Sequence, residues 1–168
     1  MLTAIIETHD DEMRLAQALA ALVPAATDGF VRDVIVIDRG SSDGTLAVAD
    51  AAGCLILGAG QGEDVRRIAA EAARGDWLLF LKVGIALPAT WQAEAAGFVD
   101  RSAAGGRSGR AVTFRRGRLA DGWRGRVRSL FAPVDATLVA RAAYLATVSS
   151  SPAFAAASSA SDARRGAA

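Results

Sequence analysis

Short apolar runs recur along the first hundred residues of the chain, separated by longer stretches of mixed polarity. Each run is four or five residues long and rich in aliphatic or aromatic side chains, which is typical of a strand buried inside a parallel sheet. The pattern predicts four strands, at Leu2–Ile6, Val34–Asp38, Cys54–Leu57 and Trp77–Leu81.

Apolar residues in the stretches between these runs fall near helical spacing. In the first stretch, Thr8 or Asp10 is positioned to cap a helix, and Pro24 is expected to end it. The other predicted helices are Thr45–Ala52, Glu63–Arg74 and Ala89–Val99. Strand and helix therefore alternate four times, which predicts an α/β fold with a mostly parallel sheet and helices on both faces.

Ligands of such sheets bind beyond the carboxyl ends of the strands, so the polar residues that follow each strand are the candidates for a site. These segments are Glu7–Asp11, Asp38–Asp43, Gly58–Asp64 and Lys82–Ile85. The sequence therefore predicts that its chemistry lies along one edge of the sheet.

The alternation weakens after residue 100. Strands are predicted at Ala111–Arg115 and Thr137–Val139, and helices at Trp123–Phe131 and Arg141–Thr147. From Ser149 onward Ser and Ala dominate and few residues can form a core. We therefore divide the chain into an α/β unit over residues 1–100, a second part over 101–148 and a flexible tail over 149–168.

Charge is distributed unevenly, although the formal net charge of the 168 residues is only +1. Residues 1–100 carry 7 basic and 15 acidic side chains, whereas residues 101–128 carry nine arginines and a single acid. One cysteine, Cys54, excludes an internal disulfide. No apolar run reaches the roughly 18 residues that span a bilayer, and the first residues lack the basic region of a secretory signal. A cytoplasmic location is expected.

The segment RGSSDGT, which follows the second predicted strand, is the most specific motif of the chain. Asp38 at the strand end can accept hydrogen bonds from a base or a ribose, and Gly40 permits a tight turn. Ser41 and Asp43 can contact a ligand, or they can only hold the turn and cap the next helix. The sequence leaves both interpretations open.

Three stretches together resemble the nucleotide-sugar half of family 2 glycosyltransferases of the GT-A fold. They are IIETHDDE at 5–12, VIVIDRGSSDGT at 34–45 and GDWLLFLKVGIALPATW at 75–91. The resemblance covers about residues 2–98, and a second, weaker resemblance lies at Asp135–Tyr144. It implies a Rossmann-like GT-A sheet flanked by helices, a nucleotide-diphosphate sugar as ligand, and a reduced acceptor half over residues 101–148.

The resemblance also implies a set of site residues. Arg66 falls where the family often has a basic residue near the donor, or it belongs to a solvated helix face. His9 can stack on a base or be a plain loop residue. Asp135 lies in the second, weaker resemblance and is the candidate catalytic base. The alternative is that Asp135 is only a surface or capping aspartate. The residues implied for nucleotide binding are Thr8, His9, Asp10, Asp38, Gly40, Ser41, Asp43, Arg66 and Lys82.

The third stretch departs from the family at its metal site. The family's fourth strand ends in paired acids that bind Mn²⁺ or Mg²⁺ and neutralise the leaving diphosphate. Here Lys82 and Gly84 stand in those positions, and Asp76 lies at the other end of the strand. We therefore expect no metal cofactor. Either the Lys82 ammonium replaces the metal at the diphosphate, or the chain is an inactive pseudoglycosyltransferase.

Arg115–Arg128 holds six arginines, and Leu119, Trp123 and Val127 are spaced four apart among them. The segment can bind an anionic membrane surface, which would place the protein at the inner face of the membrane. It can also bind phosphates, or neutralise the acidic part of this chain or of an acidic partner. Nucleic acid is not an expected partner, because no recognition motif accompanies the charge.

Overall fold

The structure is a computed structural model, and it describes residues 1–58, 65–84, 87–104, 112–114 and 136–149. Several predictions fall on other parts of the chain. The predicted helix over 123–131, the arginine-rich segment, Asp135 and nearly all of the predicted tail lie outside the described residues. The division of the chain into three parts therefore stays a prediction.

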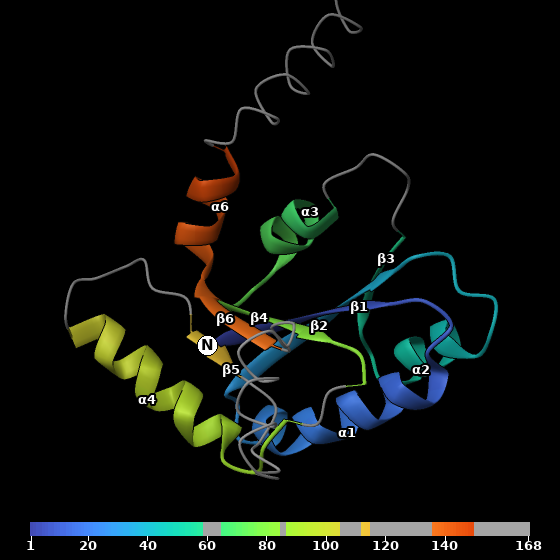
Figure 1. Cartoon of the computed structure of the whole chain (residues 1–168), viewed down its shortest axis with the longest axis horizontal. Helices are drawn as coiled ribbons and strands as arrows, with labels where there is room; N and C mark the ends of the chain where they lie inside the picture. The colour runs from blue at the N-terminus through green and yellow to red at the C-terminus, as the bar shows by residue number, and fades with distance from the viewer. Residues whose placement is uncertain (59–64, 85–86, 105–111, 115–135, 150–168) are drawn as a thin grey trace, which may run out of the picture.

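Within the described residues the strands form one six-stranded sheet with the order β3-β2-β1-β4-β6-β5 (Figure 1). The strands are β1 (Leu2–Thr8), β2 (Val31–Asp38), β3 (Leu55–Gly58), β4 (Trp77–Lys82), β5 (Val112–Phe114) and β6 (Ala136–Ala140). The first four are parallel to one another, whereas β6 pairs antiparallel with both β4 and β5. The prediction of a mostly parallel sheet is confirmed.

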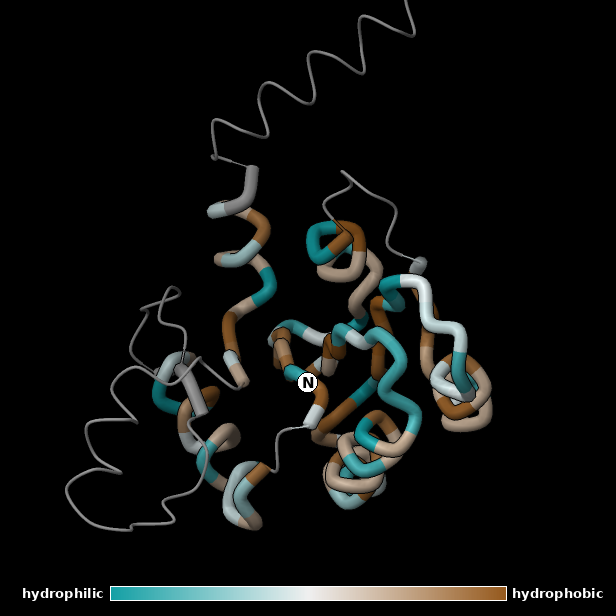
Figure 2. Tube along the Cα trace, turned by 45° about the vertical axis from the view of Figure 1, so that its right-hand side comes forward, coloured by the Kyte–Doolittle hydropathy of each residue, from teal (hydrophilic) through white to brown (hydrophobic). Residues whose placement is uncertain are grey.

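Helices cover both faces of the sheet, as predicted. They are α1 (Glu12–Thr27), α2 (Thr45–Ala51), α3 (Val65–Ala72), α4 (Trp91–Ala104) and α6 (Arg141–Ser149). In Figure 1, α1, α2 and α4 lie below the sheet and α3 and α6 lie above it. Two hydrophobic clusters correspond to these faces, one around Leu15, Leu22 and Trp91, the other around Ile5, Val65 and Leu78. Hydrophobic residues gather in the strands, while the helices mix both kinds (Figure 2).

Two predictions about α1 are wrong. Pro24 does not end the helix but lies inside its last turns, and the helix continues to Thr27. Leu22 and Ala25 are both buried on either side of Pro24, so packing of the apolar stripe holds the final turn despite the missing N–H. Neither Thr8 nor Asp10 caps the helix. Its N-cap position is Asp11, whose side chain makes no capping hydrogen bond.

A buried hydrogen-bond chain ties the amino ends of the parallel strands together. The Gly75 N–H donates to the Thr3 hydroxyl at 2.8 Å, and that hydroxyl donates to the Asp33 carboxylate. Gly75 passes so close to β1 that an added Cβ would lie 2.6 Å from the Thr3 backbone nitrogen. These hydrogen bonds lie at the amino ends of the strands, at the opposite end of the sheet from the candidate site.

Candidate functional site

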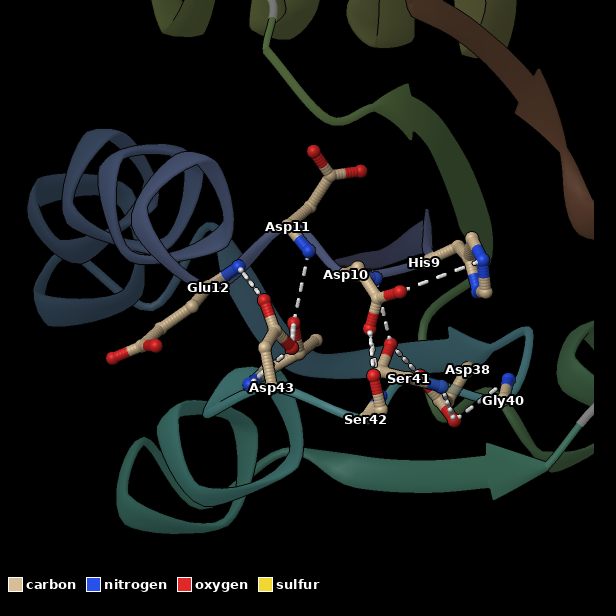
Figure 3. A network of polar contacts seen from close by, with 10 residues as sticks. His9, Asp10, Asp11, Glu12, Asp38, Gly40, Ser41, Ser42 and Asp43 are labelled. Carbon is tan, nitrogen blue, oxygen red and sulfur yellow. Dashed lines mark hydrogen bonds and ion pairs between the residues drawn. The ribbon is translucent and has the colours of Figure 1, made fainter.

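The loops that follow β1 and β2 are bonded to each other (Figure 3). The Asp10 N–H donates to the Ser41 hydroxyl at 3.0 Å, and the Ser42 N–H donates to the Asp10 carboxylate at 2.6 Å. That bond to the Ser42 backbone holds the pKa of Asp10 below its ordinary value. Asp10 has a φ of 50°, a left-handed conformation that aspartate tolerates better than most residues. The two loops therefore fix one another.

Asp43 accepts hydrogen bonds from backbone N–H groups at the amino ends of α1 and α2. Hydrogen bonds from Thr45 hold the pKa of Asp43 below its ordinary value, and the Thr45 N–H lies 3.0 Å from one carboxylate oxygen. The other oxygen accepts from the Glu12 N–H at 3.2 Å, at the first residue of α1. The Thr45 hydroxyl accepts from the Asp11 N–H at 3.0 Å. Asp43 and Thr45 thus supply the caps that the side chain of Asp11 does not.

The Asp38 carboxylate accepts hydrogen bonds from the turn that directly follows it. Its side chain is nearly buried, with a relative exposure of 6%. The carboxylate accepts from the Gly40 N–H at 3.0 Å and from the Ser41 N–H at 3.1 Å, and it also accepts from the Ser41 hydroxyl. Gly40 has a φ of 89°, which only glycine adopts without strain, and this lets the chain fold back over the carboxylate.

A pocket of about 870 Å³ opens at the carboxyl ends of β1 and β4 and extends between the sheet and α6. The volume falls within the range usual for small-molecule sites. Its floor is apolar and aromatic, and the rings of Phe80 and Tyr144 lie 4.9 Å apart there. Its polar and charged lining residues are Glu7, Thr8, His9, Asp11, Arg39, Arg66, Lys82, Thr137, Tyr144 and Thr147.

Glu7 joins two arginines at the wall of this pocket. One carboxylate oxygen accepts from Arg39 Nη2 at 3.3 Å, and the other accepts from Arg66 Nε. Partial burial alone would raise the pKa of Glu7, but the hydrogen bonds and charges of Arg66 and Arg39 outweigh it and hold the pKa below its ordinary value. Glu7 is therefore a carboxylate at neutral pH, and both of its oxygens are engaged.

Lys82 is the register partner of Glu7 on the neighbouring strand. Equivalent positions on adjacent parallel strands carry their side chains on the same face, so both residues belong to the α3 and α6 face at its carboxyl end. The Lys82 side chain is exposed, lines the pocket and has no ion-pair partner within 4.0 Å among the described residues. Gly84, two residues further on, has a φ of 86°.

The described residues do not fit a divalent metal. Among them, no group of three or more His, Cys, Asp or Glu side chains is placed to hold an ion. The two acids that line the pocket are each paired with arginine, Glu7 with Arg39 and Arg66, and Asp11 with Arg14 at 2.9 Å. The Lys82 ammonium would repel a cation at the end of β4.

The residues predicted for the site separate into two groups. Thr8, His9, Arg66 and Lys82 line the pocket. The others that the structure describes form the bonded loops beside it and are Asp10, Asp38, Gly40, Ser41 and Asp43. Asp135 lies outside the described residues. Glu7 and Arg39, which also line the pocket, lie in the segments predicted to follow strands but are not among the residues implied for nucleotide binding, and Phe80 and Tyr144 are not predicted as site residues.

The sheet order and the antiparallel β6 are those of a GT-A fold. Solved structures agree. Crystal structures of glucosyl-3-phosphoglycerate synthase from Mycobacterium tuberculosis match with TM-scores of 0.56 to 0.57 and 18–19% identity. They cover 84% of this chain, and one was determined with Mn²⁺, UDP and phosphoglyceric acid, another with Mn²⁺, UDP-glucose and phosphoglyceric acid. The chain spans 56% of the length of these two structures.

The GT-A fold expected from the sequence is thereby confirmed, while at this level of identity the likeness extends to the fold alone. No family model and no curated protein matches the sequence. Among the helices that the structure describes, none combines the length and the apolar character needed to cross a membrane.

Proposed function

We propose that the pocket binds a nucleotide-diphosphate sugar, with the diphosphate held by side chains rather than by a metal. The observation that carries this proposal is the convergence of three cationic side chains on the pocket wall, Arg39, Arg66 and Lys82. They come from the loop after β2, from α3 and from the end of β4. Guanidinium and ammonium groups are the usual partners of phosphate oxygens.

The charges of the wall suit such a ligand. The three cations and the two acids that line the pocket, Glu7 and Asp11, leave a net charge of about +1, and the diphosphate bridge of a nucleotide sugar carries about two negative charges. A complex of a structural neighbour contains Mn²⁺ together with UDP. In this chain the described residues place an ammonium, Lys82, on the pocket wall and do not fit a divalent metal.

Thr8 adds a neutral contact. Its side chain is 3% exposed, and its hydroxyl has no hydrogen-bond partner among the described residues. A buried hydroxyl without a partner destabilises a protein by about 1–3 kcal/mol. Because Thr8 lines the pocket, a ribose or phosphate oxygen of the ligand would satisfy this group.

A second candidate is a protein that binds the nucleotide sugar without transferring it. This candidate is favoured because both acids that line the pocket, Glu7 and Asp11, form ion pairs with arginines, and a carboxylate paired with arginine is a poor general base. Transfer would then depend on Asp135, the base implied by the resemblance. Binding of an anionic membrane surface or of an acidic partner through Arg115–Arg128 is a separate proposal, tested by reversing those charges.

The test is calorimetric titration of the full chain with UDP, GDP and their sugar conjugates, first with Mn²⁺ and then with EDTA. Binding that persists in EDTA supports the metal-free site. Binding only with Mn²⁺ would overturn it, and no binding in either condition would overturn the nucleotide-sugar proposal as a whole. For a ligand that binds, release of the sugar to water or to an added acceptor then separates an enzyme from a binding protein.

A further inference from the structure

The Glu7 carboxylate occupies the point on which two pocket arginines converge. Each of its oxygens faces a different guanidinium, at 3.3 Å from Arg39 Nη2 and in contact with Arg66 Nε. The arginines come from two different elements, one from the loop after β2 and one from α3. Both guanidiniums therefore point at a single anionic group of two oxygens.

A phosphoryl group presents the same chemistry as this carboxylate. It places two or three anionic oxygens on one atom, and arginine pairs with carboxylate and phosphate through the same planar donors. A phosphoryl group that enters the pocket thus competes with Glu7 for the same two partners.

We propose that Arg39 and Arg66 form a phosphoryl subsite, that the Glu7 carboxylate fills it while no ligand is bound, and that the ligand displaces the carboxylate. The identity of the ligand as a nucleotide diphosphate rests on the proposed function, whereas the competition itself does not. Glu7 thereby sets the affinity of the site, because every anion that binds must first replace an internal one.

The fold permits this exchange. The backbone of Glu7 is fixed by pairing with Ile37 on one side and with Lys82 on the other, so only the side chain has to move. That side chain is 26% exposed, which gives the displaced carboxylate access to water. Arg39 and Arg66 are about half exposed, at 47% and 57%, so the two ion pairs are screened by solvent and can be broken by a ligand.

The experiment compares Glu7→Gln with Glu71→Gln in calorimetric titrations of inorganic pyrophosphate and of UDP. Each variant removes one negative charge. Glu71 pairs with Arg67 on α3 and does not line the pocket, so its variant reports the effect of bulk charge alone. We expect Glu7→Gln to bind pyrophosphate about threefold to tenfold more tightly than the parent chain, as the loss of two screened ion pairs implies, and Glu71→Gln to change little. Circular dichroism spectra that match the parent chain's, and cooperative melting curves, establish that the variants are folded.

A double-variant cycle tests that Glu7 acts through the arginines. In the background of Arg39→Gln, the gain from Glu7→Gln should shrink, since one of the two competed partners is gone. Equal affinities of Glu7→Gln and the parent would overturn the competition while leaving the proposed function intact. Weaker binding by Glu7→Gln would also overturn it, since Glu7 would then be positioning the arginines. Failure of every variant to bind either probe would overturn the competition and the proposed function together.

Discussion

Replacing Lys82 by methionine should weaken binding of a nucleoside diphosphate about tenfold and leave binding of the nucleoside unchanged. A hydrogen bond to a charged group contributes about 1.5–3 kcal/mol. Lys82 is exposed, so solvent screening favours the lower end, and about 1.5 kcal/mol corresponds to roughly a tenfold change in Kd. Its backbone ends β4 directly after the buried Leu81, so the strand should stay in place in the variant.

The assay is calorimetry with UDP or GDP, whichever the parent chain binds more tightly, and with the corresponding nucleoside. Arg32→Gln is the control. Arg32 is also an exposed cation, but it stands near the amino end of β2, at the opposite end of the sheet from the pocket. Equal losses in the two variants would show that only total charge matters. An unchanged affinity in Lys82→Met, or an equal loss for the nucleoside, would refute a contact between Lys82 and the diphosphate.

Three further predictions concern the fold and the charges of the site. Thr3→Val should lower the free energy of unfolding by about 1–3 kcal/mol in urea without changing ligand affinity, because it leaves buried polar partners unsatisfied far from the pocket. Gly75→Ala should lower it by about 3 kcal/mol, since the added Cβ would meet backbone at 2.6 Å; a loss no larger than that of an exposed glycine would contradict this contact. Lys82→Asp with Gly84→Asp should make diphosphate binding depend on Mn²⁺, which titration with and without EDTA would reveal.

The depressed pKa of Glu7 predicts a dependence of stability on pH. Its ion pairs contribute stability that is fully present above the ordinary value of 4.5 and is lost as the pH falls through the lower pKa of the folded state. Urea unfolding of the parent and of Glu7→Gln should therefore differ at pH 7, and the difference should shrink toward pH 3. A constant difference over that range would show that the carboxylate is not ion-paired in solution.

The sheet could be predicted where a strand contains a short, nearly continuous apolar run. Leu2–Ile6 and Trp77–Leu81 were placed to within two residues of β1 and β4, because both strands are buried between two layers of helices. β2 was predicted to begin at Val34, but it begins at Val31. Arg32 and Asp33 interrupt the apolar run. Asp33 accepts a hydrogen bond from the hydroxyl of Thr3, a distant partner that the local sequence pattern does not reveal.

The pocket could be predicted only in part. Thr8 and Lys82 are the last residues of β1 and β4, and the rule that parallel sheets bind ligands at their carboxyl ends is enough to select them. The pairing of Glu7 with Arg39 and Arg66 depends on strand order and on where α3 packs, which no local pattern of the sequence contains. The same holds for Tyr144, which reaches the floor only because β6 pairs antiparallel with β4 and carries α6 over it.

The residues of the motif Asp38–Thr45 are weaker evidence of ligand binding than the charged residues of the pocket wall. Asp38, Ser41 and Asp43 have their oxygens engaged by backbone and hydroxyl groups of the same two loops. A fold that had lost its ligand would still retain them, since they cap helices and close a turn. Glu7 and Lys82 are different, because neither caps a helix or closes a turn and both place charge on the pocket wall. Variation at these two positions, rather than at the motif, should therefore decide what this pocket binds.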